Sequence, residues 1–151
     1  MFSCSYDAEV WIRHSLRCLP EAVRFDIEPR VAFVCVDSSD ARRLSREFCD
    51  DNEIIILSER IIPRGPLVED HWQVRYFMFA VLHEVAHALR NHRSPQAISA
   101  QENADQEREA DELAFNWFNN HLSETNQPIY SQYELMKAQQ ENQAAWKIRF
   151  G

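Results

Sequence analysis

The sequence predicts an α+β fold in which a small β-sheet packs on a central helix and a second long helix follows. Two short apolar runs, Val31–Val36 and Glu53–Ser58, are bounded by polar or turn-forming residues, as buried strands are. Apolar residues recur at helical spacing over residues 70–91, and a helix-start signal at Ser99 opens another long segment. At 151 residues the chain is expected to form a single domain, residues 1–151.

The N-terminal third of the chain is predicted to hold one helix and one strand. An amphipathic helix over residues 7–19 stops at Pro20, and its apolar stripe is formed by Ala8, Ile12, Leu16 and Leu19. The strand VAFVCV follows. Before the second strand, EIIILS, the segment ARRLSREF at residues 41–48 fits either a short helix or an irregular strand.

The central helix is predicted over residues 70–91. Asp70 and Gln73 have the spacing of a capping box. The residues that recur at helical spacing along it are Val74, Phe77, Met78, Val81, Val85 and Leu89.

Two further helices are predicted after the central one. The first opens with Ser99 and Glu102 in capping-box relation and runs to about Leu122. The second starts at Ser131, with Glu134 three residues later.

Composition and charge exclude several classes of function. The net charge is −8 and no stretch concentrates Lys and Arg, so a nucleic-acid partner is not expected. Two glycines are too few for a phosphate-binding loop. The longest apolar run, residues 77–82, is too short to span a bilayer, and no membrane partner is expected. The four cysteines form no CxxC pair, so neither a zinc knuckle nor a thioredoxin-type motif is expected. The N-terminus shows no basic start followed by an apolar stretch, so a reducing, cytoplasmic location is expected.

The motif HEVAH lies inside the central helix. His83 and His87 are four residues apart, so both imidazoles project from one helix face and can reach a single cation such as Zn²⁺. Glu84, beside them, could take a proton from a metal-activated water. Because short motifs also arise by chance, the hypothesis requires a third ligand elsewhere in the chain.

The second long helix supplies two candidate acidic residues. Its predicted apolar arc contains Ala104, Ala110, Leu113, Ala114, Trp117 and Phe118, and its polar arc contains Asp105, Glu109, Glu112 and Asn116. Glu107 and Asp111 fall in the middle of the apolar arc, where a carboxylate needs a partner. We therefore predict Glu107 as the third ligand and Asp111 as the hydrogen-bond acceptor that orients one histidine. Ion pairs with Arg75 or Arg90 are the alternative.

The two motifs together resemble the gluzincin metallopeptidases. HEVAH followed by EREAD matches their pattern of HExxH and then a glutamate within ExxxD on the next helix. The phrase EREADELA, with EIIILS ahead of HEVAHALRNH, is similar to the HtpX and CAAX-prenyl-protease type and to the soluble ImmA/IrrE type. The resemblance covers residues 31–122 and implies a zincin-like fold. The membrane-embedded relatives carry transmembrane helices with no counterpart here, so the soluble type is the better analogue.

The resemblance implies a zinc-dependent metalloendopeptidase. Zn²⁺ on His83, His87 and Glu107 would activate a water, and Glu84 would act as general base. In this family a strand shortly before the HExxH helix binds the extended peptide substrate, which here implies strand-edge contacts from Ile54, Ile55 and Ile56. The donor that stabilises the oxyanion is not assigned; its candidates are Tyr130, Tyr133, His121 and Arg90. The remaining histidines, His14, His71 and His92, are interpreted as structural. His92 lies five residues beyond His87, so helical spacing predicts that it points away from the metal-binding face.

A second hypothesis is a metal-binding regulatory domain with little or no turnover. It would act through a transcriptional regulator or another protein, a partner that the ImmA/IrrE resemblance also suggests for an active peptidase. Glu84 favours catalysis, because a structural zinc site needs no base and closes its fourth position with a protein ligand. The same three ligands would also accept manganese, iron or cobalt.

Overall fold

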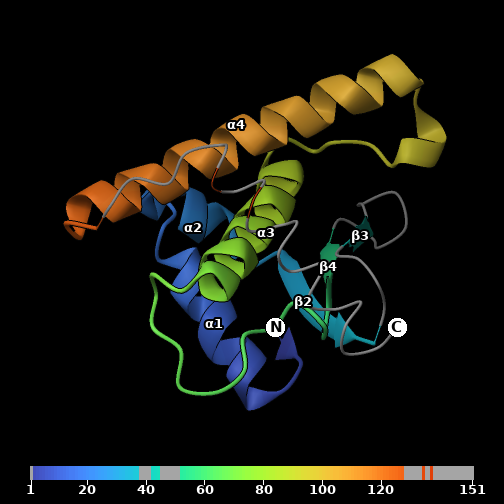
Figure 1. Cartoon of the computed structure of the whole chain (residues 1–151). Helices are drawn as coiled ribbons and strands as arrows, with labels where there is room; N and C mark the ends of the chain where they lie inside the picture. The colour runs from blue at the N-terminus through green and yellow to red at the C-terminus, as the bar shows by residue number, and fades with distance from the viewer. Residues whose placement is uncertain (1, 38–41, 45–51, 128–133, 135–136, 138–151) are drawn as a thin grey trace.

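The computed structural model describes residues 2–37, 42–44, 52–127, 134 and 137, which form an α+β fold (Figure 1). Four strands form one sheet in the order β1-β2-β4-β3. The strands are β1 (Phe2–Ser3), β2 (Val31–Val36), β3 (Arg42–Leu44) and β4 (Glu53–Ser58). The helices are α1 (Tyr6–Leu16), α2 (Glu21–Ile27), α3 (Trp72–Leu89) and α4 (Ala100–Glu124), with a short 3₁₀ turn, η2 (Pro95–Ala97), before α4.

The two strands predicted from sequence are confirmed and form the centre of the sheet. β2 and β4 run parallel, in a register that pairs Val31 with Glu53 and Val36 with Ser58. Their β-branched side chains alternate between the core and a half-buried face, as in β4, where Ile55 and Leu57 are fully buried. The ambiguous segment at residues 41–48 contributes the strand β3, antiparallel to β4.

The prediction that Ile54, Ile55 and Ile56 lie at a free strand edge is wrong. β4 pairs with β2 on one side and with β3 on the other, where Ile54 pairs with Leu44 and Ile56 with Arg42. Its backbone groups already take part in two ladders, so a peptide cannot add to it as a further strand. The strand at this end of the sheet order is β3.

The first predicted helix is confirmed but is shorter than expected, and a second helix follows it. α1 ends at Leu16, and Leu19 is buried in the connection beyond it. Pro20 then caps a further helix, α2, that the sequence analysis did not anticipate. A proline is compatible with a helix start because the first turn has no acceptor for its missing N–H.

The long helices α3 and α4 are confirmed, with one correction at the start of α3. The ring nitrogen Nδ1 of His71 accepts from the backbone N–H of Gln73 at 3.2 Å, so His71 is the N-cap and not Asp70. α4 has the predicted capping box. The Ser99 hydroxyl accepts from the Glu102 N–H at 3.2 Å, and the Ser99 N–H donates to the Glu102 carboxylate at 2.9 Å.

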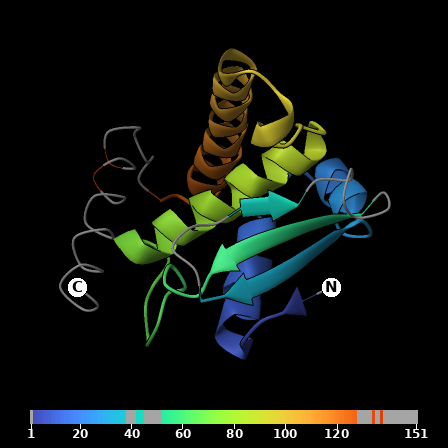
Figure 2. The same cartoon turned by 90° about the vertical axis from the view of Figure 1, so that its right-hand side faces the viewer.

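α3 is the central element of the fold. It lies between α4 and the sheet, and it also contacts α1 and α2 (Figures 1 and 2). Its buried side chains lie around most of its circumference, as expected for a helix covered on several sides. Any group on α3 that faces α4 is therefore held in a rigid position.

Three remaining predictions concern the ends of the chain, the membrane and the cysteines. The helix predicted from Ser131 lies outside the described residues, except that the backbone is helical at Glu134 and Lys137. Among the described helices, none combines the length and the apolar character needed to cross a bilayer. The described cysteines Cys4, Cys18 and Cys35 are free thiols.

Candidate metal centre

The two motif histidines lie side by side near the end of α3 and face α4. Their ring centroids are 4.7 Å apart, and the Nε2 atoms of His83 and His87 are 3.0 Å apart. His87 is buried and His83 is partly buried, with 17% of its side chain exposed. The one-turn separation thus directs the same ring nitrogen of each residue to one point.

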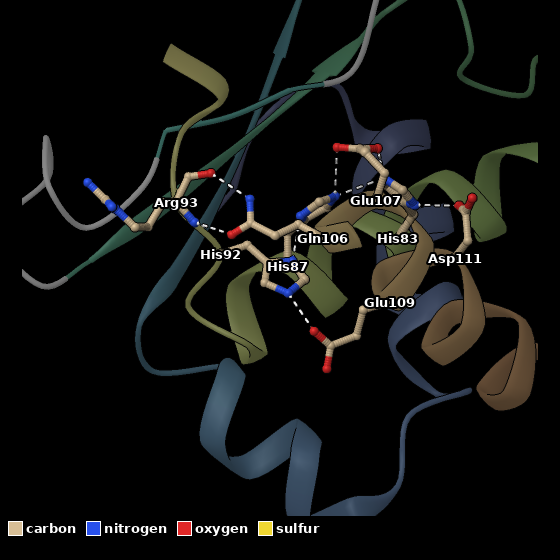
Figure 3. A network of polar contacts seen from close by, with 8 residues as sticks. All are labelled: His83, His87, His92, Arg93, Gln106, Glu107, Glu109 and Asp111. Atoms are coloured by element: carbon tan, nitrogen blue, oxygen red, sulfur yellow. Dashed lines mark hydrogen bonds and ion pairs between the residues drawn. The ribbon is translucent and has the colours of Figure 1, made fainter. Parts of the chain in front are cut away.

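Glu107 of α4 completes the cluster (Figure 3). Its Oε2 lies 3.3 Å from Nε2 of His83, and its Oε1 lies 3.4 Å from Nε2 of His87. A tetrahedral cation with ligand bonds of about 2.0–2.1 Å separates its donors by about 3.3–3.4 Å. Two imidazole nitrogens and a carboxylate at these separations can therefore hold a metal ion.

The linker between the helices positions Glu107. α3 ends at Leu89, and Asn91, just beyond the C-cap Arg90, has a φ of 54°, the left-handed conformation that commonly follows a helix end. The Gln106 side chain then accepts from the Arg93 N–H at 2.8 Å and donates to the Arg93 carbonyl at 3.1 Å (Figure 3). Both bonds come from the residue before Glu107, so they fix the rotation of α4 about its axis relative to the end of α3.

The pKa shifts in the cluster are those of a carboxylate that is hydrogen-bonded to a protonated imidazole. Hydrogen bonds with His83 and His87 hold the pKa of Glu107 well below its ordinary range, although burial opposes this. Burial also lowers the pKa of His83, but hydrogen bonds to Asp111 and Glu107 outweigh it and raise that pKa to about 10. The pKa of His87 is lowered, chiefly by burial. The cluster thus keeps an ionised carboxylate beside one cationic imidazole.

Asp111 lies where the sequence predicted it, but the reason given for it was partly wrong. Its Oδ1 is 2.8 Å from Nδ1 of His83, on the far side of the ring from Glu107. The side chains of Glu107 and Asp111 are 46% and 53% exposed, so neither carboxylate is buried in the core. The prediction assumed that the apolar face of α4 is covered along its whole length, but the N-terminal half of α4 borders solvent.

His92 belongs to this network, contrary to the expectation that it points away. Its Nδ1 lies 2.8 Å from Nδ1 of His87, and its Nε2 lies 2.9 Å from the carboxylate of Glu109. Glu109 in turn pairs with Arg90 at 3.0 Å, so it does not simply face solvent. Helical spacing placed His92 wrongly because α3 has ended before it. Asn91 next to a histidine was the available signal, since asparagine tolerates the left-handed conformation.

The contacts from His87 through His92 to Glu109 determine which ring nitrogens carry protons. If Nε2 of His87 binds a metal, its Nδ1 carries the proton and donates to Nδ1 of His92. His92 must then be neutral at Nδ1 and protonated at Nε2, from which it donates to Glu109. His92 and Glu109 together orient His87 as Asp111 orients His83.

Glu84 is buried, with 8% of its surface exposed, on the same helix as both histidines. Its charge contributes to the raised pKa of His83, its neighbour in sequence. A buried carboxylate next to a ligand histidine is a candidate to accept and return a proton.

The other candidates named from sequence do not join the cluster. Arg90 is held by Glu109 and pairs with neither Glu107 nor Asp111 in the described part of the chain. His121 contacts Glu69, as does His14, and His71 caps α3. Tyr130 and Tyr133 lie outside the described residues.

A comparison with protein families found a match that spans the residues of this site. Residues 75–144 match the Peptidase U49 family. The match covers slightly less than half of the chain and contains both HEVAH and the acidic residues of α4. This is a similarity over part of the chain to a family described as peptidases. Searches of curated proteins and of solved structures gave no match.

Proposed function

We propose that this protein is a zinc-dependent metalloendopeptidase. The observation that carries the proposal is the convergence of His83, His87 and Glu107 on one point, with donor separations of 3.0, 3.3 and 3.4 Å. Two imidazoles and one carboxylate are a ligand set of catalytic zinc sites. The Peptidase U49 match over both helices supports the same activity.

Each residue of the centre has a distinct part in the reaction. His83, His87 and Glu107 would hold the cation, and Asp111 and His92 would fix the orientation of the two imidazoles. A cation bound there would supply Lewis-acid chemistry and a water acidic enough to ionise near neutral pH. The Glu84 carboxylate would accept a proton from the attacking water and deliver it to the leaving amine.

The substrate is proposed to bind as an extended strand along β3. β3 is terminal in the sheet order, so no strand among the described residues pairs with its outer backbone groups. An extended peptide that adds to such an edge gains main-chain hydrogen bonds whatever its sequence. This arrangement replaces the expectation that Ile54–Ile56 contact the substrate.

The test separates metal binding from proton transfer. Metal content and cleavage of an unfolded protein are measured for the wild type, Glu107→Gln and Glu84→Gln. Glu112→Gln, an exposed carboxylate of the same helix, is the matched control. We expect Glu107→Gln to lose the metal at this site. Glu84→Gln should keep it and lose cleavage by at least about 100-fold.

Two outcomes would reject the proposal. Cleavage by Glu84→Gln at the wild-type rate would exclude this carboxylate as the general base. A wild type that retains the metal at Glu107 without cleaving any unfolded substrate would instead favour a regulatory metal-binding domain.

A further inference from the structure

A second cluster of potential metal ligands lies near the other end of α4. It brings together His14 of α1, Glu69 of the segment before α3, and His121 of α4. Nε2 of His14 is 2.6 Å from Oε2 of Glu69, and Nε2 of His121 is 2.7 Å from Oε1. All three side chains are largely covered, with exposures of 27%, 20% and 13%.

This cluster is independent of the centre at His83 and His87. His121 follows Glu107 by fourteen residues on one helix, a distance of about 21 Å along its axis. Two cooperating catalytic ions lie only about 3.5–4 Å apart. An ion here would therefore be structural and would take no part in the cleavage chemistry.

We propose that His14, Glu69 and His121 form a second divalent-cation site that ties α1 and the segment before α3 to the C-terminal part of α4. The donor types are the same as at the first centre, two Nε2 atoms and one carboxylate, a set that favours zinc over calcium or magnesium. The three ligands come from separate parts of the chain, so an ion bound to them would cross-link the fold.

The distances from Glu69 to His14 and His121 are those of the cluster without a bound metal, when hydrogen bonds join the three side chains. Contacts of 2.6 and 2.7 Å are charge-assisted hydrogen bonds between an imidazole N–H and a carboxylate. A tetrahedral cation needs about 3.3–3.4 Å between donors, which requires the side chains to separate by about 0.7 Å. Side-chain rotation alone can supply a movement of this size.

Gln127 offers a fourth donor. Its Nε2 donates to Oε1 of Glu69 at 3.0 Å, whereas its Oε1 is buried and has no hydrogen-bond partner within the described residues. A half-turn of the amide would bring this oxygen to the Glu69 carboxylate. Two oxygens repel each other there unless a cation lies between them, so metal binding would satisfy an acceptor that is otherwise unpaired.

The cluster also has a path to solvent. A cavity of about 270 Å³ is lined by Val10, Trp11, His14, Arg17 and Glu69. Arg17 is exposed at the end of α1, where water screens its repulsion toward a cation. A hydrated ion can therefore reach Glu69 and His14 without unfolding of the helices.

The experiment counts bound zinc by equilibrium dialysis in the wild type, Glu69→Gln, Glu107→Gln and the double variant. We expect two ions per wild-type chain, one in each single variant and none in the double variant. Zinc should raise the melting temperature of Glu107→Gln but not that of the double variant. If the proposed catalytic centre fails and the second site is real, the wild type and Glu107→Gln should each bind one ion and Glu69→Gln none, so the two failures are distinguishable.

One ion per wild-type chain, with none in Glu107→Gln and one in Glu69→Gln, would overturn the second site and leave a hydrogen-bonded cluster. If Glu69→Gln does not fold, the Glu107→Gln variant alone tests the second site, because its His14, Glu69 and His121 are unchanged. Addition of Co²⁺ to that variant should produce the visible absorption of a cobalt centre with nitrogen ligands. A spectrum identical to that of free Co²⁺ would reject the proposal.

Discussion

At the scale of single residues, the centre depends on backbone geometry as much as on the HEVAH motif. His83 and His87 could be paired from sequence because helical spacing is a local property. His92 could not, because Asn91 turns the chain by adopting a φ of 54°, and only then does the next side chain face His87. The exposure of Glu107 was also misjudged, since it depends on how far α4 extends beyond its neighbours.

Replacing His92 by phenylalanine should weaken metal binding by about 10–100-fold, the usual effect of losing the partner of a ligating histidine. His87 would lose the acceptor for its Nδ1 proton while the buried ring volume is kept. The measurement is the dissociation constant of zinc by competition with a chelator. His92→Asn should recover part of the affinity because its side-chain oxygen can accept the same proton. Equal affinity in His92→Phe and the wild type would show that His92 only fills space.

At the scale of elements, the sequence predicted those with strong local signals. β2 and β4 were recognised as β-branched runs between breakers, and α4 by its capping box. α2 and β3 were missed or left open because each is short and depends on its neighbours for burial or pairing. The position of β4 inside the sheet is set by long-range pairing with β3, which no local pattern records.

The capping box of α4 should make stability depend on pH. The backbone N–H and then the hydroxyl of Ser99 hydrogen-bond to Glu102 and lower its pKa. A carboxylate with a lowered pKa stabilises the fold above its unfolded pKa of about 4.3, and this contribution is lost as the pH falls through the folded value. Glu102→Gln should therefore melt at a lower temperature than the wild type at pH 7, and the difference should shrink as the pH falls below the unfolded pKa and vanish below the folded one.

The melting curves are followed by circular dichroism between pH 3 and 7. Glu112→Gln is the control, since this exposed carboxylate lies in the middle of α4 and caps no helix end. A constant difference between Glu102→Gln and the wild type across that range would contradict the assignment of the cap.

At the scale of the whole molecule, α3 connects every layer. It is packed against α1, α2, α4 and β4. The candidate centre lies where α3 meets α4, so a bound ion would join the two helices directly. Hydrophobic periodicity in the sequence predicted the sheet and the two long helices. Which face of α3 packs against which neighbour could be seen only in the folded structure.

Removal of metal should lower the melting temperature of the protein. A ligand at 100 times its dissociation constant stabilises the folded state by about 2.7 kcal/mol. For a domain of this size that corresponds to about 5–10 °C. The comparison is the wild type in excess zinc and in EDTA, with Glu107→Gln as a variant in which the difference should be smaller. Equal differences in the two proteins would place the stabilising ion away from Glu107.

The two hydrogen bonds between Gln106 and Arg93 affect how the site can change during evolution. They join Arg93, just after α3, to Gln106 of α4, and so fix Glu107 relative to α3 whatever path the chain takes between Arg93 and α4. Residues 94–98 can therefore be lengthened or shortened without moving the third ligand. The twenty-residue interval between His87 and Glu107 is then one permitted spacing among several. Homologues should be sought with a variable gap and a glutamine directly before the glutamate.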